Sequence, residues 1–236
     1  MNKLTEKTVY NIFFDFGYVL ELDKDIKKVT NNFNFKDYSN QLLKALDLVN
    51  QNQVDTFFDV FDSYFSTKAN IYLLGNGGSQ ANAHHISGDF MKTFSLAGLK
   101  LKISCLADNV CHLTAAANDL SYDEAYSILI DSLIDKDDLL IYLSGSGNSL
   151  NLVKCARKAK LRDIKQAAIT GFNGGALNDI VDYPIHIKFN DMEICEDIQL
   201  SIFHYVKQRL ISKYSEYFTN LDLPKYQKRT LEDLIS

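Results

Sequence analysis

Prolines and linkers are scarce in this chain. It holds only two prolines, Pro184 and Pro224, and no stretch rich in glycine and serine. No internal linker between domains is therefore indicated. Apolar runs of the ~18 residues that a membrane helix needs are also missing, and the first residues do not have the pattern of a secretory signal. We expect a soluble, intracellular, cytoplasmic protein with no membrane partner.

The chain has no excess of positive charge. It carries 25 Lys and Arg against 30 Asp and Glu, a formal net charge of -5, and its pI is near 5.5. A basic face for nucleic acid is therefore not expected. A small anionic ligand can still bind at a local site.

Cysteines are few and far apart. The four, with no CxxC pair among them, are Cys105, Cys111, Cys155 and Cys195. Neither a disulfide framework nor a zinc knuckle is predicted. Reduced and mostly buried thiols, as in a cytosolic protein, are the expectation.

Hydrophobic residues, in contrast, make up 46% of the 236 positions, which suits one large domain or one domain with an appendage. Apolar residues at three- and four-residue steps over 35–65 predict one long or two consecutive amphipathic helices. Short apolar runs then alternate with helical patterns. Strands are expected at 71–74, 101–106, 139–144, 165–170 and 183–188. Helices are expected near 79–94, 110–134, 148–161 and 193–219.

The expected strands show little polar alternation and are separated by helices, which predicts an α/β fold with a parallel sheet covered on both faces. Ligands of such sheets bind where the carboxyl ends of strands meet the amino ends of helices. Two of these junctions are rich in glycine and serine. They are the first loop, LLGNGGSQ (Leu73–Gln80), and the second loop, YLSGSGNSLNLV (Tyr142–Val153).

Both loops have the composition of an anion site. Glycines permit tight turns and close approach of the backbone to a ligand. Backbone N–H groups at a helix start then attract an anion. Ser144, Ser146 and Ser149 add neutral donors that suit a phosphate monoester. Neither loop matches G-x-x-x-x-G-K-[ST] or G-x-G-x-x-G, so no nucleotide cofactor is expected.

Two further segments carry candidate proton-transfer groups. His85 and Asp89 are four residues apart and so share one helical face, where they would exchange protons with a sugar, hold a divalent metal, or form a surface pair. His204 lies in the apolar stripe of the last expected helix. There it is either a core residue or a catalyst. Glu196 stands near the start of that helix, where an acid is favourable.

The segments GNGGSQANAHH, AAANDLSYDEAYS and LSGSGNSLNLV together resemble the sugar isomerase (SIS) domain family, most closely its phosphoheptose isomerases. The resemblance covers roughly residues 35–218. It implies a flavodoxin-like three-layer sandwich around a parallel sheet, preceded by N-terminal helices, and a homotetramer with active sites between subunits. The implied reaction converts sedoheptulose 7-phosphate into D-glycero-D-manno-heptose 7-phosphate through an enediol. This step is the entry to the bacterial heptose of lipopolysaccharide or capsule.

The resemblance also assigns roles to residues. Catalysis would fall to Asp89 and His204. Zinc-containing members bind the metal at the positions of His85, Asp89, Glu196 and His204. The phosphate and the sugar would be bound at Asn76, Gly77, Gly78, Ser79, Asp119, Ser144, Gly145, Ser146 and Ser149.

Four positions depart from the residues that are usual in the heptose isomerases. Asp89 replaces a glutamate and loses one methylene of reach, and a misplacement of about 1 Å can cost ~100-fold in rate. Glu196 replaces a glutamine and adds a negative charge. Gly145 and Thr93 stand where threonine and arginine are common. Either the site is a compensated zinc site of two histidines and two carboxylates, or the substrate is a different sugar phosphate.

Two non-catalytic functions stay open as alternatives. Some relatives of the isomerases are binding or regulatory proteins, one of which associates with a replication initiator, and they lack the histidine that is present here as His204. A sugar-phosphate sensor is the other alternative, although no DNA-binding helix pair precedes the domain.

The ends of the chain are expected to be separate from the domain. We predict an N-terminal extension over 1–34, the SIS domain over 35–221 and a C-terminal tail over 222–236. Residues 11–23, NIFFDFGYVLELD, resemble the first strand and loop of haloacid-dehalogenase-type phosphatases, but so short a segment cannot supply the rest of that fold. We expect an added strand or arm that packs on the domain or on a neighbouring subunit.

Overall fold

The structure is a computed structural model that describes residues 33–65 and 67–219. The chain divides into two compact units, residues 1–39 and 40–236. The segment at 11–23 and the expected tail at 222–236 lie outside the described residues, so the expected domain boundaries stay predictions. Within the described ranges, the strands and the helices from α3 onward belong to the second unit, which is described below.

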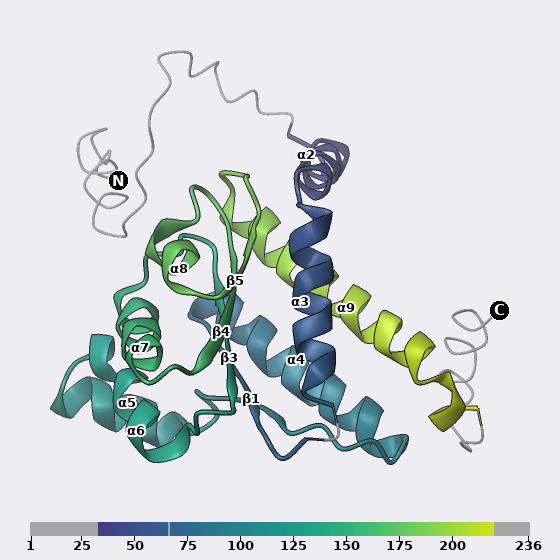
Figure 1. The fold of residues 1–236 in the computed structure, drawn as a ribbon. Helices are drawn as coiled ribbons and strands as arrows, with labels where there is room; N and C mark the ends of the chain where they lie inside the picture. Colours follow the sequence, from purple (N-terminus) through teal and green to yellow (C-terminus); the bar gives the residue numbers. More distant parts are fainter. Residues whose placement is uncertain (1–32, 66, 220–236) are drawn as a thin grey trace, which may run out of the picture. The chain divides into compact units, whose positions relative to one another are not determined.

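The centre of the second unit is a five-stranded sheet in which every neighbouring pair of strands is parallel (Figure 1). Its order is β2-β1-β3-β4-β5. The strands are β1 (Ile71–Leu74), β2 (Ile103–Cys105), β3 (Leu139–Ser144), β4 (Lys165–Thr170) and β5 (Tyr183–His186). All six residues of β3 are buried, because helices cover both faces of a central parallel strand. The predicted parallel sheet is confirmed, with β2 and β5 shorter than expected.

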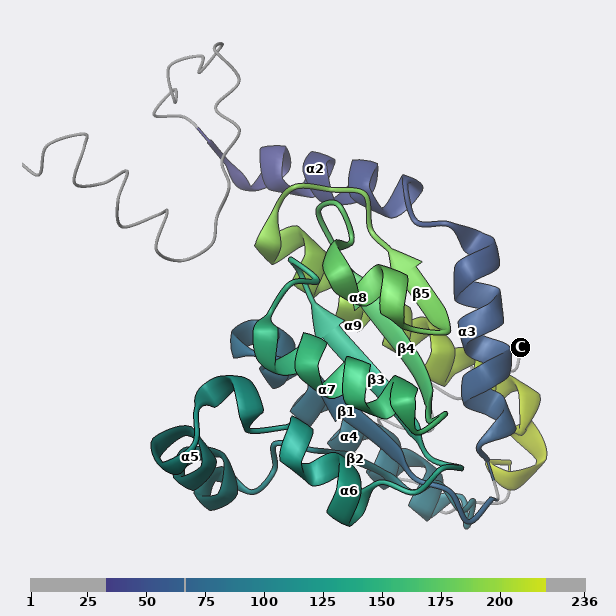
Figure 2. The same cartoon turned by 60° about the vertical axis from the view of Figure 1, so that its left-hand side comes forward.

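Helices cover both faces of this sheet (Figures 1 and 2). One face carries α3 (Gln51–Ser63), α4 (Gly77–Leu96) and α9 (Met192–Lys213), and the other carries α5 (Val110–Asp119), α6 (Ile130–Leu133), α7 (Leu150–Leu161) and α8 (Gly175–Ile180). The predicted three-layer sandwich is therefore confirmed. Among the described residues, no helix combines the length and apolar character needed to cross a membrane.

The amphipathic region at 35–65 forms two helices, α2 (Phe35–Asp47) and α3. The break falls at Asn50, whose side chain accepts hydrogen bonds from the N–H groups of Asn52 and Gln53 and so caps α3. The sequence pattern left open whether one helix or two would form. This cap is the local reason for two.

The prediction of a single helix near 110–134 is wrong. That segment contains α5, two short 3-10 turns (Tyr122–Glu124 and Ser127–Leu129) and α6. The helix ends because Leu120 (φ -118°, ψ -86°) and Ser121 (φ -172°, ψ 160°) leave the helical region. After the break, Tyr126 donates a hydrogen bond to the carbonyl oxygen of Gly75, 3.2 Å away. Such a tertiary contact is invisible to periodicity.

Two other helices also differ from expectation. The short helix α8 was not predicted, and α9 ends at Lys213, before a 3-10 turn at Ser215–Tyr217. Six residues are too few for a helical period to stand out in a sequence.

A cluster of phenylalanines binds α3, α4 and α9 together. The rings of Phe61 and Phe90 lie 5.3 Å apart, and those of Phe57 and Phe203 lie 5.5 Å apart, both edge to face. All four side chains are at most 1% exposed. Edge-to-face pairs add to the stabilisation that burial itself provides. The cluster therefore fixes α9 against α4.

Truncation of this cluster should destabilise the fold. We expect Phe61→Ala to lower the free energy of unfolding by about 3–5 kcal/mol, because it removes a fully buried ring and leaves a cavity. Urea denaturation followed by circular dichroism measures the loss. Leu161→Ala, at a position that is 87% exposed, serves as control and should change stability by less than about 0.5 kcal/mol. Equal losses in the two variants would contradict this account of the core.

Candidate functional site

The first and second loops meet at the point where the strand order of the sheet reverses. The first loop follows β1 and the second follows β3, which are neighbours in the sheet. Sheets of order 2-1-3-4-5 bind ligands at this point. The side-chain amides of Asn76 and Asn151 donate hydrogen bonds to each other, each 2.9 Å long. These two bonds fix the loops relative to one another.

Each loop opens a helix without a side-chain cap. Asn76 is the N-cap residue of α4 and Ser149 that of α7, and neither side chain makes a capping hydrogen bond. Backbone N–H groups of an uncapped helix start, at the positive end of the helix dipole, favour an anion. Two such starts therefore lie at one edge of the sheet.

The serines of the second loop add hydroxyl groups at the same place. Ser144 is buried, and its Oγ accepts a hydrogen bond of 3.1 Å from the N–H of Gly147. The Oγ of Ser146 accepts one of 3.2 Å from the N–H of Asn148. A hydroxyl that accepts from the backbone keeps its own proton to donate to an anion.

Helices α4 and α9 pack side by side and run in the same direction. This follows from the residues that pair across them, whose numbers rise along both helices. The pairs are Ser79 with Glu196 (3.4 Å), Asn82 with Gln199 (3.1 Å) and His85 with His204 (3.4 Å). Polar groups of α9 are thereby brought next to the first loop and along the helix that leaves it. This packing assembles the candidate site.

Three of the predicted proton-transfer or metal-binding residues gather between these helices. The Nε2 atoms of His85 and His204 are 3.4 Å apart, with their rings nearly perpendicular at 84°. One ligand atom from each of His85, Asp89 and His204 lies within 4.8 Å of the other two. Asp89 also pairs with Lys207 of α9, and more weakly with Lys92 at 3.8 Å. The group can hold a divalent metal if the carboxylate leaves Lys207.

The charges around this group set its protonation. Burial lowers the pKa of the His204 imidazole, and the positive charge of Lys207 lowers it further. Burial acts to raise the pKa of the Asp89 carboxyl, but the hydrogen bond and charge of Lys207 outweigh it, so that this pKa falls below its usual value. Near neutral pH the site therefore combines a neutral imidazole with an ionised carboxylate.

Glu196, the fourth expected metal ligand, lies beside the first loop instead. It accepts a hydrogen bond of 3.4 Å from the Ser79 hydroxyl, and its carboxylate fills the space where a side chain on Gly78 would stand. Burial raises the pKa of the Glu196 carboxyl, an effect that hydrogen bonds from Ser79 partly offset. In this arrangement Glu196 contacts the first loop rather than the group around His85.

Asp119 lies at the exposed end of α5, where it accepts a hydrogen bond of 2.8 Å from Asn118. The contact with the first loop comes from Tyr122, which donates a hydrogen bond of 2.7 Å to Asn76. Sequence reasoning missed Tyr122, Asn151 and Lys207. Each had some signal: Asn151 lies in the second loop, Tyr122 lies in the segment AAANDLSYDEAYS, and Lys207 stands three residues after His204 and so shares its helical face.

The glycine at position 145 has a structural explanation. A side chain on Gly145 would overlap the sulfur of Met192, the first residue of α9. The threonine that is common here in heptose isomerases would therefore displace Met192. Gly145 and Met192 form a complementary pair that shapes the second loop.

Comparison with known proteins identifies the family. Residues 34–171 match the SIS domain. The chain is 27% identical over 172 residues to a phosphoheptose isomerase of Synechocystis sp., covering 73% of this chain and 89% of that protein. It is 34% identical over 137 residues to one of Shewanella denitrificans, covering 57% and 70%. The chain belongs to the SIS domain family.

A solved structure shares the fold of this SIS domain. The phosphoheptose isomerase of Neisseria gonorrhoeae superposes with a TM-score of 0.66 at 22% identity, over 72% of this chain and 94% of that one. The family match at 34–171 contains both loops, His85 and Asp89 but ends before α9. The placement of Glu196 and His204 in the site thus comes from the packing of α9.

The second loop of the SIS domain depends on a glycine. Gly147 has a φ of +66°, and a side chain there would overlap the backbone carbonyl of Gly174. Gly98 has a similar φ of +69° but open space around it. Both replacements by alanine should cost about 1–2 kcal/mol of backbone strain. Gly147→Ala should cost at least about 1 kcal/mol more, because the backbone must also shift.

Urea denaturation of the two glycine variants measures this difference. Equal losses of stability in Gly147→Ala and Gly98→Ala would show that the second loop has more room than the structure gives it.

Proposed function

We propose that this protein is an aldose-ketose isomerase that converts sedoheptulose 7-phosphate into D-glycero-D-manno-heptose 7-phosphate. The observation that carries the proposal is the group of His85, Asp89 and His204, whose ligand atoms lie within 4.8 Å of each other on two helices. Relatives named phosphoheptose isomerase support the choice of substrate.

The phosphate would bind at the junction of the two loops. In the proposal, Ser144, Ser146 and Ser149 donate hydroxyl hydrogen bonds to its oxygens, together with the N–H groups at the starts of α4 and α7. Ser79 would do the same once its hydroxyl turns away from Glu196. Asn76 and Asp119 would lie beside the sugar. The bonds that Asn76 receives from Tyr122 and exchanges with Asn151 support a fixed orientation of its amide.

The isomerisation moves hydrogens between two carbons and two oxygens. A proton leaves C1 of the ketose and returns to C2, while the proton of the C1 hydroxyl is replaced by one on the oxygen of C2. His204, neutral near pH 7, fits the first transfer because it can accept the carbon-bound proton and give it back. Asp89, held ionised by Lys207, fits the exchange between the oxygens.

Zinc would be held by His85, Asp89 and His204. A mixed nitrogen and oxygen donor set of this kind suits zinc, and Glu196 could join it only by leaving Ser79. When bound, such an ion polarises the substrate carbonyl. The Asp89 carboxylate cannot pair with Lys207 and bind the metal at the same strength. The two cations would therefore compete for it.

We also propose the assembly and location that the family resemblance implies, a cytoplasmic homotetramer with active sites between subunits. An apolar groove beside α9 supports an interface on this side of the molecule. It is lined by Leu46, Val49, Gln51, Val54, Ser201, Ile202 and Tyr205. His204 lies on the same helix, next to Tyr205 of this groove.

Incubation with sedoheptulose 7-phosphate, followed by NMR, tests the reaction. We expect Asp89→Asn and His204→Gln to lower kcat by about 10²–10⁴-fold, because each removes a proton-transfer group. Ligand-induced thermal shifts should persist in both variants. Gln208→Ala, an exposed position on α9, is the control and should keep full activity.

Absence of turnover in the wild-type protein, with or without zinc, would contradict the isomerase proposal. If the thermal shift with the sugar phosphate remained in that case, the protein would be a sugar-phosphate-binding protein.

The protonation of His204 should depend on Lys207. In the metal-free protein its imidazole is expected to titrate below the usual value of about 6.5, and Lys207→Met should raise that pKa by removing a neighbouring positive charge. NMR titration of the histidine ring signals measures both. Lys92→Met is the matched control, since Lys92 acts on Asp89 and not on His204.

The sign of the linked stability change follows from the lowered pKa of His204. The folded state binds fewer protons than the unfolded state in this range, so the contribution of His204 to stability is present above about pH 6.5 and is lost as the pH falls through the folded-state pKa. If the pKa of His204 were unchanged in Lys207→Met, Lys207 would not be a cause of its low value.

A further inference from the structure

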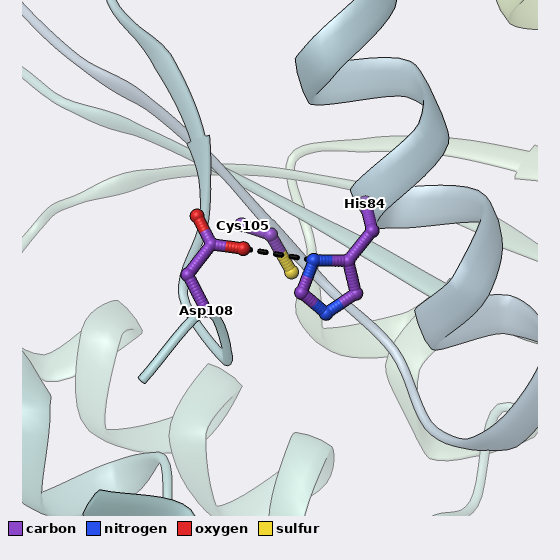
Figure 3. A group of neighbouring side chains, drawn as sticks. All are labelled: His84, Cys105 and Asp108. Carbon is purple, nitrogen blue, oxygen red and sulfur yellow. Dashed lines mark ion pairs between the residues drawn. The ribbon is translucent and has the colours of Figure 1, made fainter. Parts of the chain in front are cut away.

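A second group of metal-binding side chains lies on the other side of α4. His84 of α4, Cys105 at the end of β2 and Asp108 in the loop after β2 converge (Figure 3). His84 Nδ1 is 2.8 Å from an Asp108 carboxylate oxygen. One ligand atom from each of the three residues lies within 4.8 Å of the others. Three separate parts of the fold thus place an imidazole, a thiol and a carboxylate together.

The side chain of Gln80 lies in the gap between the imidazole and the thiol. Its Nε2 is 2.8 Å from His84 Nε2 and 2.7 Å from Cys105 Sγ. Its Oε1 accepts a hydrogen bond of 3.1 Å from the N–H of Gly75 in the first loop. Gln80, the last residue of the first loop, therefore connects this group to Gly75 near the start of that loop.

A surface ion pair accounts for only part of this arrangement. His84 and Asp108 are about half exposed, and such pairs add little stability. The pair does not explain why a thiol that is 3% exposed lies against it, or why an amide spans the imidazole and the sulfur. Sulfur, nitrogen and oxygen donors in one place are what zinc and related ions take, with a fourth position left for water.

We propose that His84, Cys105 and Asp108 form a second metal site, for a divalent transition metal of the zinc type, distinct from the group around His85. The ion would bind at His84 Nδ1, the nitrogen that faces Asp108, together with the Asp108 carboxylate and the Cys105 sulfur. A dication binds there with loss of the thiol proton, because the thiolate is the form of cysteine that binds metals. Binding of the ion to the sulfur would also change the contact between Gln80 and Cys105, and Gln80 accepts a hydrogen bond from Gly75.

Cobalt(II) distinguishes the two groups, because only the second contains sulfur. Titration of the purified, metal-free protein with Co²⁺ should produce the near-ultraviolet absorption of a thiolate bound to cobalt. Cys105→Ser should abolish this absorption. Cys111→Ser, which changes the exposed cysteine, and His85→Ala, which changes the other group, should both retain it.

The other two ligands have their own variants. Asp108→Asn and His84→Gln should each weaken Co²⁺ binding at this site by at least about tenfold. The site is overturned if wild-type protein shows no thiolate absorption with Co²⁺, or if the absorption survives Cys105→Ser.

X-ray absorption of cobalt-loaded Cys111→Ser protein keeps the test decisive if Cys105→Ser does not fold. A sulfur neighbour at about 2.3 Å from the metal supports the site, and a shell of nitrogen and oxygen alone overturns it. Neither measurement requires turnover, so their outcome is independent of the isomerase proposal.

Discussion

The packing of α9 along α4 is the constraint on which the candidate site depends. Asn82 donates a hydrogen bond of 3.1 Å to Gln199, which is fully buried, and the rings of Phe90 and Phe203 meet close by. Apolar packing alone tolerates sliding of one helix along another, whereas a buried amide that loses its partner is costly. The Asn82–Gln199 bond therefore sets the register that brings His204 to His85.

Lys207 places a positive charge beside Asp89 and His204. It stands one turn after His204 and neutralises Asp89, which has a shorter reach than the glutamate usual at this position. The same cation keeps the carboxylate ionised and the imidazole neutral. It also occupies the carboxylate that a metal would need. A metal that bound to this group would compete with Lys207 for a single side chain.

Much of the fold could be predicted from the sequence, because helices cover both faces of the sheet and its strands appear as short apolar runs. The shared face of His85 and Asp89 likewise follows from their spacing. The position of Glu196 beside Ser79 could not be predicted, because it depends on how α9 sits against α4. The break after α5 was missed for a similar reason, since the tyrosines that follow it bond to the first loop.

Consecutive residues of α4 point to different neighbours, and this gives the helix two polar stripes. Ser79 and His85 face α9, whereas Gln80 and His84 face β2 and the loop after it. Residues four apart share a face, so Gln80 and His84 can bond to each other at 2.8 Å. Both stripes begin in the first loop, at Ser79 and Gln80. A change on either face of α4 therefore acts on the first loop, through Glu196 on one side and through Gln80 on the other.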